Sequence, residues 1–571
     1  MSSESHLTGC LSAGVARFAG ISCAAALLMA CTDMRVINRG ERGTADNFAA
    51  PAPQPTVPSA STVSSGVTGS SSEWPTSFGS TVDPPVASEH FVFAVSPKGG
   101  AVAVLDATSR GIETVPTGDS PSRLAVIPGQ DACLVLNTGD DTVSIIRVES
   151  LGKITTTTID LPAGTNAIAV APDGETAVAY FNADLLTDAN FGDFQGVSLL
   201  SLTPGKESSS SVVVGYKPSV VRYTADSRKI VVVTEVGISL IDPQAVVPAG
   251  SGIATSLAFT DGYYSPSQVM VSPDGAYVVG LAVNPTRLSL IDTVNGSPSL
   301  DLALNQFLKT NAKGQVTDDG TNLPAESLMG GMQCVATPQG SAVFCSFAYL
   351  NAILRVPVPA GFTDPTAIER HLLPAAIDAI LTPLSETQVS VAAYGYPYLI
   401  AMDFAVGGAD TTIQVRKMIH SVVASPDRGT LIVDHLAAWG DPAAPGISAD
   451  VRVDRSNGFT LLHPSNGDLK LQLTRSPVSQ VVFDGDSDGA LLLFNSSNDS
   501  VREAIIARLT SFSVSNPLGF DTPPVAGGDV AGAGNAFVLQ GHSAGRISYI
   551  DWASGDIETV TGFGLNNRIR N

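Results

Sequence analysis

From about residue 90 onward, short apolar stretches alternate with turn residues in a repeating unit. Each unit has an apolar strand ending in a Ser-Pro-Asp-Gly-like turn, a second strand, a short turn, a third strand ending in Asp, and a fourth strand. Copies begin at Pro121, Thr165, Lys217, Ser265, Met332, Ala376, Ser421, Ser479 and about Val525. Repeats spaced mostly about 44 to 53 residues apart indicate a propeller or a solenoid.

The strands of these units are rich in Val, Ile, Leu and Ala and carry little charge. This composition predicts burial on both faces of each sheet, as in stacked blades. Pro presets φ at the first corner of a turn and Gly accepts a positive φ at its end, so Pro-Asp-Gly between two apolar runs favours a hairpin. The fold class expected is therefore all-β, a β-propeller of four-stranded antiparallel blades.

The first and last units match each other. Asp106 aligns with Asp551, and each is followed by the sequence Ile-Glu-Thr-Val. The first unit lacks a first strand, and the C-terminus stops where one would begin. We expect one closed ring of seven to ten blades, with the repeat count at the high end, in which Asn567–Asn571 completes the blade begun at His90 and hides two sheet edges. Two rings are the alternative.

The segment from Val102 to Val148, VAVLDATSRGIETVPTGDSPSRLAVIPGQDACLVLNTGDDTVSIIRV, resembles the YVTN-type β-propeller repeat, which is related to lactonase-like propellers. The likeness covers most of residues 90–569; it is strong in the first four copies and loose in the rest. It implies seven or eight blades, fewer than the ten units that the chain contains.

The N-terminus reads as an export signal. Arg17 precedes a short apolar run, Phe18–Ala30, which is too brief to span a bilayer. The run ends in Leu-Met-Ala-Cys, which resembles a bacterial lipobox with Cys31 as the lipidated residue, although Met29 stands where a small residue is usual. We expect a lipoprotein signal peptide over residues 1–30. An ordinary signal peptide, or a core helix with a chance Cys, is the alternative.

Residues 31–88 are expected to form the lipidated Cys and a disordered Pro/Ser/Thr-rich tether, and residues 89–571 the propeller. A coil of this length has an r.m.s. span on the order of 40 Å. The lipid anchor predicts a membrane partner and a place in the cell envelope, at the outer membrane, on its periplasmic or outer side.

The chain is acidic, with a formal net charge of −22. This charge repels phosphate backbones, and no Lys/Arg stripe offsets it, so nucleic acid is not an expected partner.

Three cysteines remain in the expected mature domain: Cys133, Cys334 and Cys345. Aligning the turn after Cys334 with the other Ser-Pro-Asp-Gly turns pairs Thr337 with Ala342, and three steps outward put Cys334 opposite Cys345 on one face. Directly opposed residues have Cα atoms close enough for a disulfide, and export favours it. Two buried free thiols are the alternative, as expected for Cys133.

The acidic segment Asp484-Gly-Asp486-Ser-Asp488-Gly matches the opening of a calcium loop, in which alternate carboxylates converge. The twelfth position holds Asn495 where an EF-hand needs Glu, and a strand follows instead of a helix. An acidic, lengthened turn is the favoured interpretation and a calcium site the alternative; no other cofactor is expected.

Gly541–Gly545 fits the GxSxG pattern of hydrolases, but the chemistry needs a strand-to-helix turn and strands flank this segment on both sides. We interpret it as a hairpin. The histidines of the expected propeller show no ligand spacing such as HxxxH.

No catalytic constellation is visible in the sequence, so the favoured function is a non-catalytic binding or scaffold module with an unknown protein or small-molecule ligand on one propeller face. The alternative, implied by the resemblance alone, is a lactonase-like hydrolase of sugar lactones. An enzyme should bring Arg, Glu and His from several blades to one mouth of the channel. An electron-transfer role is disfavoured, because the chain has no CxxCH for haem attachment.

Overall fold

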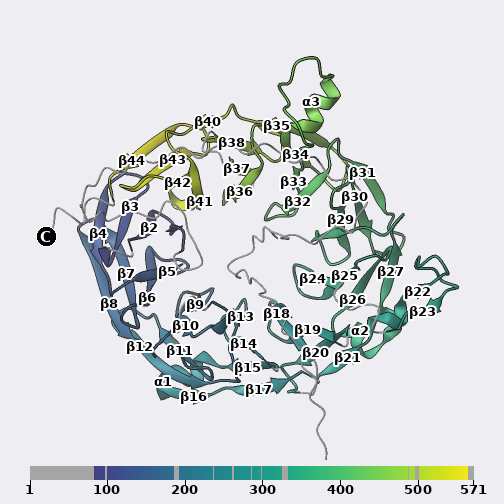
Figure 1. The fold of residues 1–571 in the computed structure, drawn as a ribbon. Helices are drawn as coiled ribbons and strands as arrows, with labels where there is room; N and C mark the ends of the chain where they lie inside the picture. Colours follow the sequence, from purple (N-terminus) through teal and green to yellow (C-terminus); the bar gives the residue numbers. More distant parts are fainter. Residues whose placement is uncertain are drawn as a thin grey trace, which may run out of the picture.

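The computed structural model describes residues 83–563, apart from residues 97–98, 186–191, 236, 260–262, 285, 297–298, 325–331, 486–487 and 495–500. The described residues form a single ring of ten antiparallel blades around a central channel (Figure 1). The all-β propeller, the single ring and the high blade count predicted from the repeats are confirmed. Cys31, residues 31–82 of the expected tether and Asp486 lie outside the described residues, whereas residues 83–88 are described and include the first strand of blade 1.

Each of the first five blades has four strands, counted outward from the channel. They are β1 (Val86–Ala87), β2 (Phe91–Ser96), β3 (Ala101–Asp106) and β4 (Ile112–Pro116) in blade 1; β5 (Pro121–Val126), β6 (Ala132–Asn137), β7 (Thr142–Ser150) and β8 (Lys153–Asp160) in blade 2; β9 (Ala167–Val170), β10 (Thr176–Tyr180), β11 (Gly196–Ser201) and β12 (Ser208–Val213) in blade 3; β13 (Val220–Tyr223), β14 (Ile230–Thr234), β15 (Gly237–Ile241) and β17 (Thr255–Ala258) in blade 4; and β18 (Tyr263–Val271), β19 (Tyr277–Asn284), β20 (Thr286–Asp292) and β21 (Leu300–Leu302) in blade 5. A short strand, β16 (Ser251–Ile253), adds to β12 in parallel.

The last five blades repeat this order. They are β24 (Met332–Ala336), β25 (Ala342–Phe347), β26 (Ala352–Pro357) and β27 (Glu369–Leu372) in blade 6; β28 (Ala379–Pro383), β29 (Gln388–Ala393), β30 (Tyr398–Asp403) and β31 (Thr411–Gln414) in blade 7; β32 (Ile419–Ala424), β33 (Leu431–His435), β34 (Asn457–Leu462) and β35 (Leu469–Thr474) in blade 8; β36 (Val478–Phe483), β37 (Gly489–Phe494), β38 (Glu503–Arg508) and a divided fourth strand, β39 (Ser513–Val514) with β40 (Leu518–Gly519), in blade 9; and β41 (Pro524–Val530), β42 (Asn535–Gln540), β43 (Arg546–Asp551) and β44 (Ile557–Thr561) in blade 10.

Helical structure is confined to connections between strands. The helices are α1 (Pro243–Ala249), α2 (Ala360–Thr363), α3 (Ala449–Arg455) and the 3-10 turns η2 (Ala183–Leu185), η3 (Leu304–Phe307), η5 (Pro365–Ala367) and η6 (Ala531–Ala533), and a small hairpin, β22 (Lys309–Thr310) with β23 (Thr321–Asn322), lies between blades 5 and 6. Within the described residues, none of these helices is long and apolar enough to cross a membrane.

Short polar side chains close the turn between the first and second strands of several blades. In blade 5, the Ser272 hydroxyl donates to Oδ1 of Asp274 (2.6 Å), and Gly275 adopts a φ of 65°. In blade 8, the Ser425 hydroxyl donates in the same way to Asp427 (2.5 Å). Because Gly reaches positive φ without a Cβ penalty and Asp accepts hydrogen bonds within the turn, this sequence forms a tight hairpin wherever it recurs.

The apolar core consists of ten layers, one in each gap between neighbouring blades, including the gap between blades 10 and 1. Successive side chains of a strand enter opposite layers. On β42, Phe537 and Leu539 pack toward blade 1, whereas Ala536 and Val538 pack toward blade 9. This period of two is why the strands are apolar at almost every position.

The ring closes by packing a complete first blade on a complete last blade. Val92 and Leu105 of blade 1 share one layer with Phe537 and Tyr549 of blade 10. In Figure 1 the first strands (purple) and the last strands (yellow) lie side by side.

This closure corrects one detail of the sequence analysis. The inner edge of blade 1 is held by β1, in the register Val86 to Phe93 and Ala87 to Val92, and not by a C-terminal strand. Asn567–Asn571, expected at that edge, lie outside the described residues. A two-residue strand is too short to show a hydrophobic period, so it could not be predicted from the sequence pattern.

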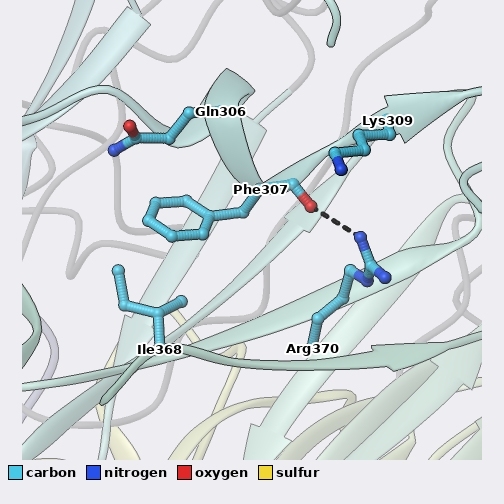
Figure 2. Close-up of a pocket in the computed structure, with 5 residues that line it drawn as sticks. All are labelled: Gln306, Phe307, Lys309, Ile368 and Arg370. Carbon is cyan, nitrogen blue, oxygen red and sulfur yellow. Dashed lines mark hydrogen bonds between the residues drawn. The ribbon is translucent and has the colours of Figure 1, made fainter. Parts of the chain in front are cut away.

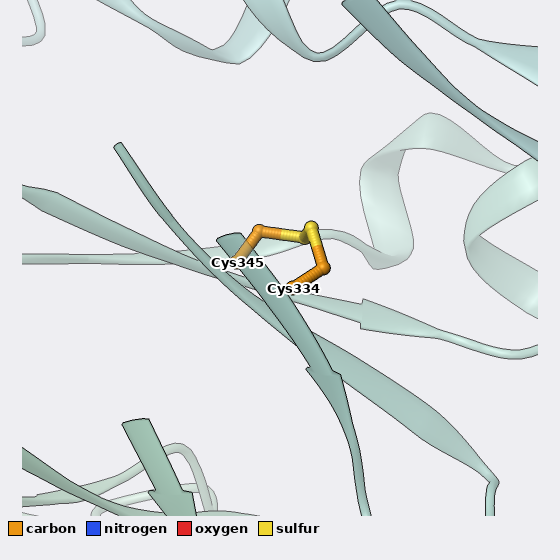
Figure 3. Close-up of a disulfide and its surroundings, with 2 residues drawn as sticks. All are labelled: Cys334 and Cys345. Atoms are coloured by element: carbon orange, nitrogen blue, oxygen red, sulfur yellow. A yellow bond between two sulfur atoms is a disulfide. The ribbon is translucent and has the colours of Figure 1, made fainter. Parts of the chain in front are cut away.

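The disulfide between Cys334 and Cys345 is present, as predicted from the hairpin register (Figure 3). The two residues are paired directly across β24 and β25, with Cα atoms 4.2 Å apart, and both are buried in the layer between blades 5 and 6. Thr337 pairs with Ala342 through a backbone hydrogen bond (2.9 Å), as the alignment of turns required. Cys133 is a buried free thiol, and burial raises its pKa.

Arg110 lies at the closing gap between blades 10 and 1. Its guanidinium carbon lies 4.4 Å from the centre of the Tyr549 ring, and its Nε is 2.6 Å from Oε2 of Glu558. We expect Arg110→Ala to lower the free energy of unfolding by about 1–2 kcal/mol, because it removes a cation–π contact over a buried ring. Thermal and denaturant unfolding measure the change.

The matched control is Lys153→Ala, which removes an exposed ion pair with Glu149 and should change stability by less than about 0.5 kcal/mol. Equal effects of the two substitutions would show that Arg110 does not hold the ring closed.

Candidate functional site

The strand order sorts the loops of the ring onto two faces. Because the strands of a blade are antiparallel and all blades have the same orientation, the loops between second and third strands lie on the same side as the loops between blades. The turns between first and second strands, and those between third and fourth strands, lie on the other side. We call the first side the aromatic face and the second the turn face.

The exposed aromatic side chains of the described residues all belong to the first side. They are Tyr216 (48% exposed), Tyr349 (86%), Tyr394 (38%), Tyr396 (51%) and Trp439 (95%). Each lies in a loop between blades or between the second and third strands of a blade. Propellers bind through their loops, and Tyr and Trp are enriched where proteins bind other molecules. The distribution therefore marks this side as the candidate binding face.

Four carboxylates of the turn face accept hydrogen bonds from neighbouring turn residues. Hydrogen bonds from turn hydroxyls and backbone N–H groups lower the pKa of Asp226, Asp274, Asp364 and Asp488. These four carboxylates thus stabilise the turns of this face.

Four residues at the junction of blades 7 and 8 form the best-defined part of the aromatic face: Tyr394, Tyr396, Met418 and His420. We call them the blade 7–8 patch. The loop after β29 is tied to the start of β32, since Gly395 N–H donates to the Ile419 carbonyl and Ile419 N–H donates to the Tyr396 carbonyl, both at 2.9 Å.

These backbone bonds fix the two segments that carry the patch relative to each other. The rings of Tyr394 and His420 are 6.3 Å apart, and Met418 is 55% exposed beside them. Two blades thus present rigidly placed aromatic and thioether groups at the inner edge of the ring.

His420 belongs to a histidine–carboxylate pair. It lies on the innermost strand β32, and its Nδ1 is 3.0 Å from Oδ2 of Asp434 on β33. Asp434 is buried and its other oxygen accepts from the N–H of Val478 in blade 9 (3.4 Å). The hydrogen bond to Asp434 raises the pKa of His420, against the opposing effect of partial burial.

Buried polar groups next to the patch form hydrogen bonds with the surrounding fold. The ammonium of Lys417 donates to the carbonyls of Val453 (2.8 Å) and Asp454 (2.9 Å) in α3, and burial lowers the pKa of Lys417. Nε2 of His435 lies 2.6 Å from the Thr460 hydroxyl, and burial lowers the pKa of His435 to about 4. His435 is therefore neutral at physiological pH and structural, whereas His420 is half-exposed and can ionise.

The pair can act on a ligand in two ways. With Nδ1 engaged by Asp434, the Nε2 of His420 can donate to a ligand when protonated or accept when neutral. In the described part of the chain, no hydrogen bond or ion pair joins an Arg or Glu side chain to this pair.

The predicted calcium ligands stay untested. Asp488 accepts from the N–H of Thr510 (3.1 Å), and Asp484 lies 3.9 Å from Arg508, while Asp486 is outside the described residues. Among the described side chains, no group of three or more His, Cys, Asp or Glu is placed to hold a metal. The calcium site remains a prediction from sequence.

Gly541–Gly545 forms the hairpin turn between β42 and β43, as interpreted from sequence. The patch itself was missed. Its histidine was counted among those without ligand spacing, because His420 and Asp434 meet across a hairpin 14 residues apart. The register of that hairpin would not have revealed the pair, because a bulge lies between Ile419 and Ser421 and regular counting from the turn places Ser421 opposite Asp434.

Comparisons with known proteins give little beyond the fold. No protein-family model matches the chain. No curated protein matches it either. Among solved structures, a eukaryotic initiation factor is 11% identical over 76% of this chain and 97% of its own (TM-score 0.45).

Two further matches are similarly distant. Dihydro-heme d1 dehydrogenase NirN in complex with DHE is 13% identical over 78% of each chain (TM-score 0.40). The Cps50 (Swd1) β-propeller domain of Myceliophteria thermophila is 12% identical over 60% of this chain and 96% of its own (TM-score 0.29). Similarities this low carry no inference about ligand or reaction.

We expect Asp434→Asn to lower the pKa of His420, because the imidazolium loses its charged hydrogen-bond acceptor. NMR titration of the His420 ring should give a pKa above 6.5 in the wild type and a lower one in the variant. The native contribution of this pair to stability is complete below pH 6.5 and is lost as pH rises through the raised pKa.

His435, with a pKa of about 4, serves as the internal control and should stay neutral over the same range in both proteins. A His420 pKa that does not respond to the substitution would contradict the proposed pairing.

Proposed function

We propose that this chain is an envelope-anchored lipoprotein whose propeller is a binding module that engages another protein through the aromatic face. The observation that carries the proposal is the gathering of the exposed aromatic side chains on one side of the ring. Tyr, Trp and Met are enriched at protein interfaces because they bury a large apolar area while keeping a polar or adaptable group.

The spread of these residues favours a protein over a small molecule. Tyr216 lies between blades 3 and 4, Tyr349 in blade 6, Tyr396 in blade 7 and Trp439 in blade 8. In Figure 1 these blades form an arc from the bottom of the ring through its right side to the top. A small ligand would contact one blade junction, whereas a protein can contact the whole arc.

The anchor follows from the sequence. Leu-Met-Ala-Cys at the end of a short apolar run supports lipidation of Cys31, and the Pro/Ser/Thr-rich segment between Cys31 and blade 1 supports a flexible tether. Tethering confines the ring near a membrane, which raises its effective concentration toward a partner there.

The hydrolase alternative has one observation in its favour, the His420–Asp434 pair near the inner edge of the ring. A general base of this kind needs a reacting group within hydrogen-bond reach. Turnover of gluconolactone-type substrates that is lost in His420→Gln would favour the hydrolase; binding activity without turnover favours the module.

The anchor predicts that cells fed labelled palmitate label the protein and that Cys31→Ser releases it from the membrane fraction. Cys10→Ser, upstream of the apolar run, is the control and should leave both label and fractionation unchanged. An unlabelled, fully soluble wild type would rule out lipidation.

If the aromatic face is the binding face, a variant that combines Tyr349→Ser, Tyr396→Ser and Trp439→Ser should no longer co-purify with a specific partner. Each aromatic anchor that is a hot spot contributes about 2 kcal/mol or more to the binding free energy. The matched control is Val294→Ser with Val406→Ser, two exposed apolar residues of the turn face. Loss of the partner in the control but not in the aromatic variant would place the interface on the opposite side of the ring.

A further inference from the structure

A second site, distinct from the blade 7–8 patch, lies on the outer rim between blades 5 and 6. Residues 303–324 form an excursion that contains η3 and the hairpin of β22 and β23, and it packs near β27, the outermost strand of blade 6 (Figure 1). Leu304, Leu308 and Val316 are buried in the core layer between these blades. The excursion is thus an ordered part of the fold.

Hydrogen bonds also hold the excursion in place. Asn305 Nδ2 donates to the Leu323 carbonyl (2.8 Å), which closes the base of the excursion. The N–H of Val316 donates to Oδ1 of Asn351 in blade 6 (2.7 Å). The space between excursion and blade therefore has fixed walls.

That space is a pocket of about 320 Å³ lined by Gln306, Phe307, Lys309, Ile368 and Arg370 (Figure 2). Its size is at the lower end of the range typical of small-molecule sites. In Figure 2, the Phe307 ring and the Ile368 side chain lie on one side, and the Lys309 ammonium and the Arg370 guanidinium lie on the other.

The apolar side of the pocket adjoins the core layer between blades 5 and 6. Phe307 and Ile368 are half-buried and pack against the layer between blades 5 and 6, so their outer surfaces are available while their inner surfaces are fixed. An aromatic ring beside a branched aliphatic side chain suits a flat or branched apolar group.

The cationic side is preorganised by Arg370. Its Nη1 donates to the carbonyl of Phe307 (2.9 Å), and its Nη2 pairs with Asp318, whose side chain is 89% exposed. Lys309 is exposed and makes no ion pair with another described side chain. Lys309, Arg370 and Asp318 together leave one net positive charge at the pocket, in a protein whose net charge is −22.

We propose that this pocket binds a small organic carboxylate with an aromatic or branched apolar body. One net positive charge matches one carboxylate, and the ammonium of Lys309 can donate to it without breaking an existing ion pair. The apolar body would lie against Phe307 and Ile368, and Gln306 offers an amide at the pocket edge. The carboxylate could belong to a free acid or to the C-terminus of a peptide, because the two present the same chemistry.

Isothermal titration of the full mature chain tests the proposal with phenylacetate and its neutral isostere phenylacetamide. We expect phenylacetate to bind at least about tenfold more tightly, because only the acid pairs with the cationic side. Lys309→Met should reduce that preference to less than about twofold, whereas Lys313→Met, at an exposed lysine of the same excursion, should leave it unchanged.

A third variant distinguishes an effect on binding from a loss of folding. Asp318→Asn removes the exposed acid beside Arg370 and should tighten phenylacetate binding, a gain that a misfolded pocket cannot give. Equal affinity for acid and amide, or equal effects of Lys309→Met and Lys313→Met, would overturn the proposal.

Acetyl-Ala-Phe and its C-terminal amide separate the two sources of carboxylate. Binding of the free-acid peptide at least as tightly as phenylacetate identifies a chain terminus, and binding of phenylacetate alone identifies a free acid; binding of neither refutes the site. These results are independent of the aromatic face, because the pocket lies on the outer rim.

Discussion

The packing of apolar side chains between neighbouring blades is the interaction on which this molecule depends. No blade has a core of its own, since both faces of each sheet are covered only by the sheets beside it. Burial therefore becomes complete only when the last blade packs on the first, as Phe537 and Tyr549 do on Val92 and Leu105. The cost of an open ring is an exposed apolar face on each of two blades and a tendency to aggregate.

The antiparallel strand order of the blades also sorts the loops onto two sides of the ring. On one side, four carboxylates accept hydrogen bonds from turn residues and are thus occupied with the fold: Asp226, Asp274, Asp364 and Asp488. The other side carries the loop of α3 and the exposed aromatic residues, which contribute little to the layers. Where two blades meet on that side, as Gly395 meets Ile419, backbone hydrogen bonds hold exposed side chains in fixed positions. The rigidity of a binding face is thus supplied by the same junctions that hold the ring together.

The sequence predicted the features that repeat. Apolar residues at nearly every strand position, and recurring Ser-Pro-Asp-Gly-like turns, indicated stacked four-stranded blades at the high end of a range of seven to ten. The register of one hairpin placed Cys334 opposite Cys345. Features that occur only once in the chain could not be predicted from the repeat pattern. The strand Val86–Ala87 is too short to carry a period, and the His420–Asp434 pair requires knowledge of strand register at a site with no motif. The rim pocket depends on how an insertion folds back, which no local pattern encodes.

Site-specific photocrosslinking in intact cells tests most directly whether the aromatic face is the binding face. A photoreactive residue would be placed singly at Tyr349, Tyr396 or Trp439 on that face, and at Val294 or Val406 on the turn face, all of them exposed. The account predicts that the three aromatic-face positions crosslink to one common partner and that the turn-face positions do not. Crosslinks to that partner from Val294 and Val406, with none from the aromatic face, would contradict it.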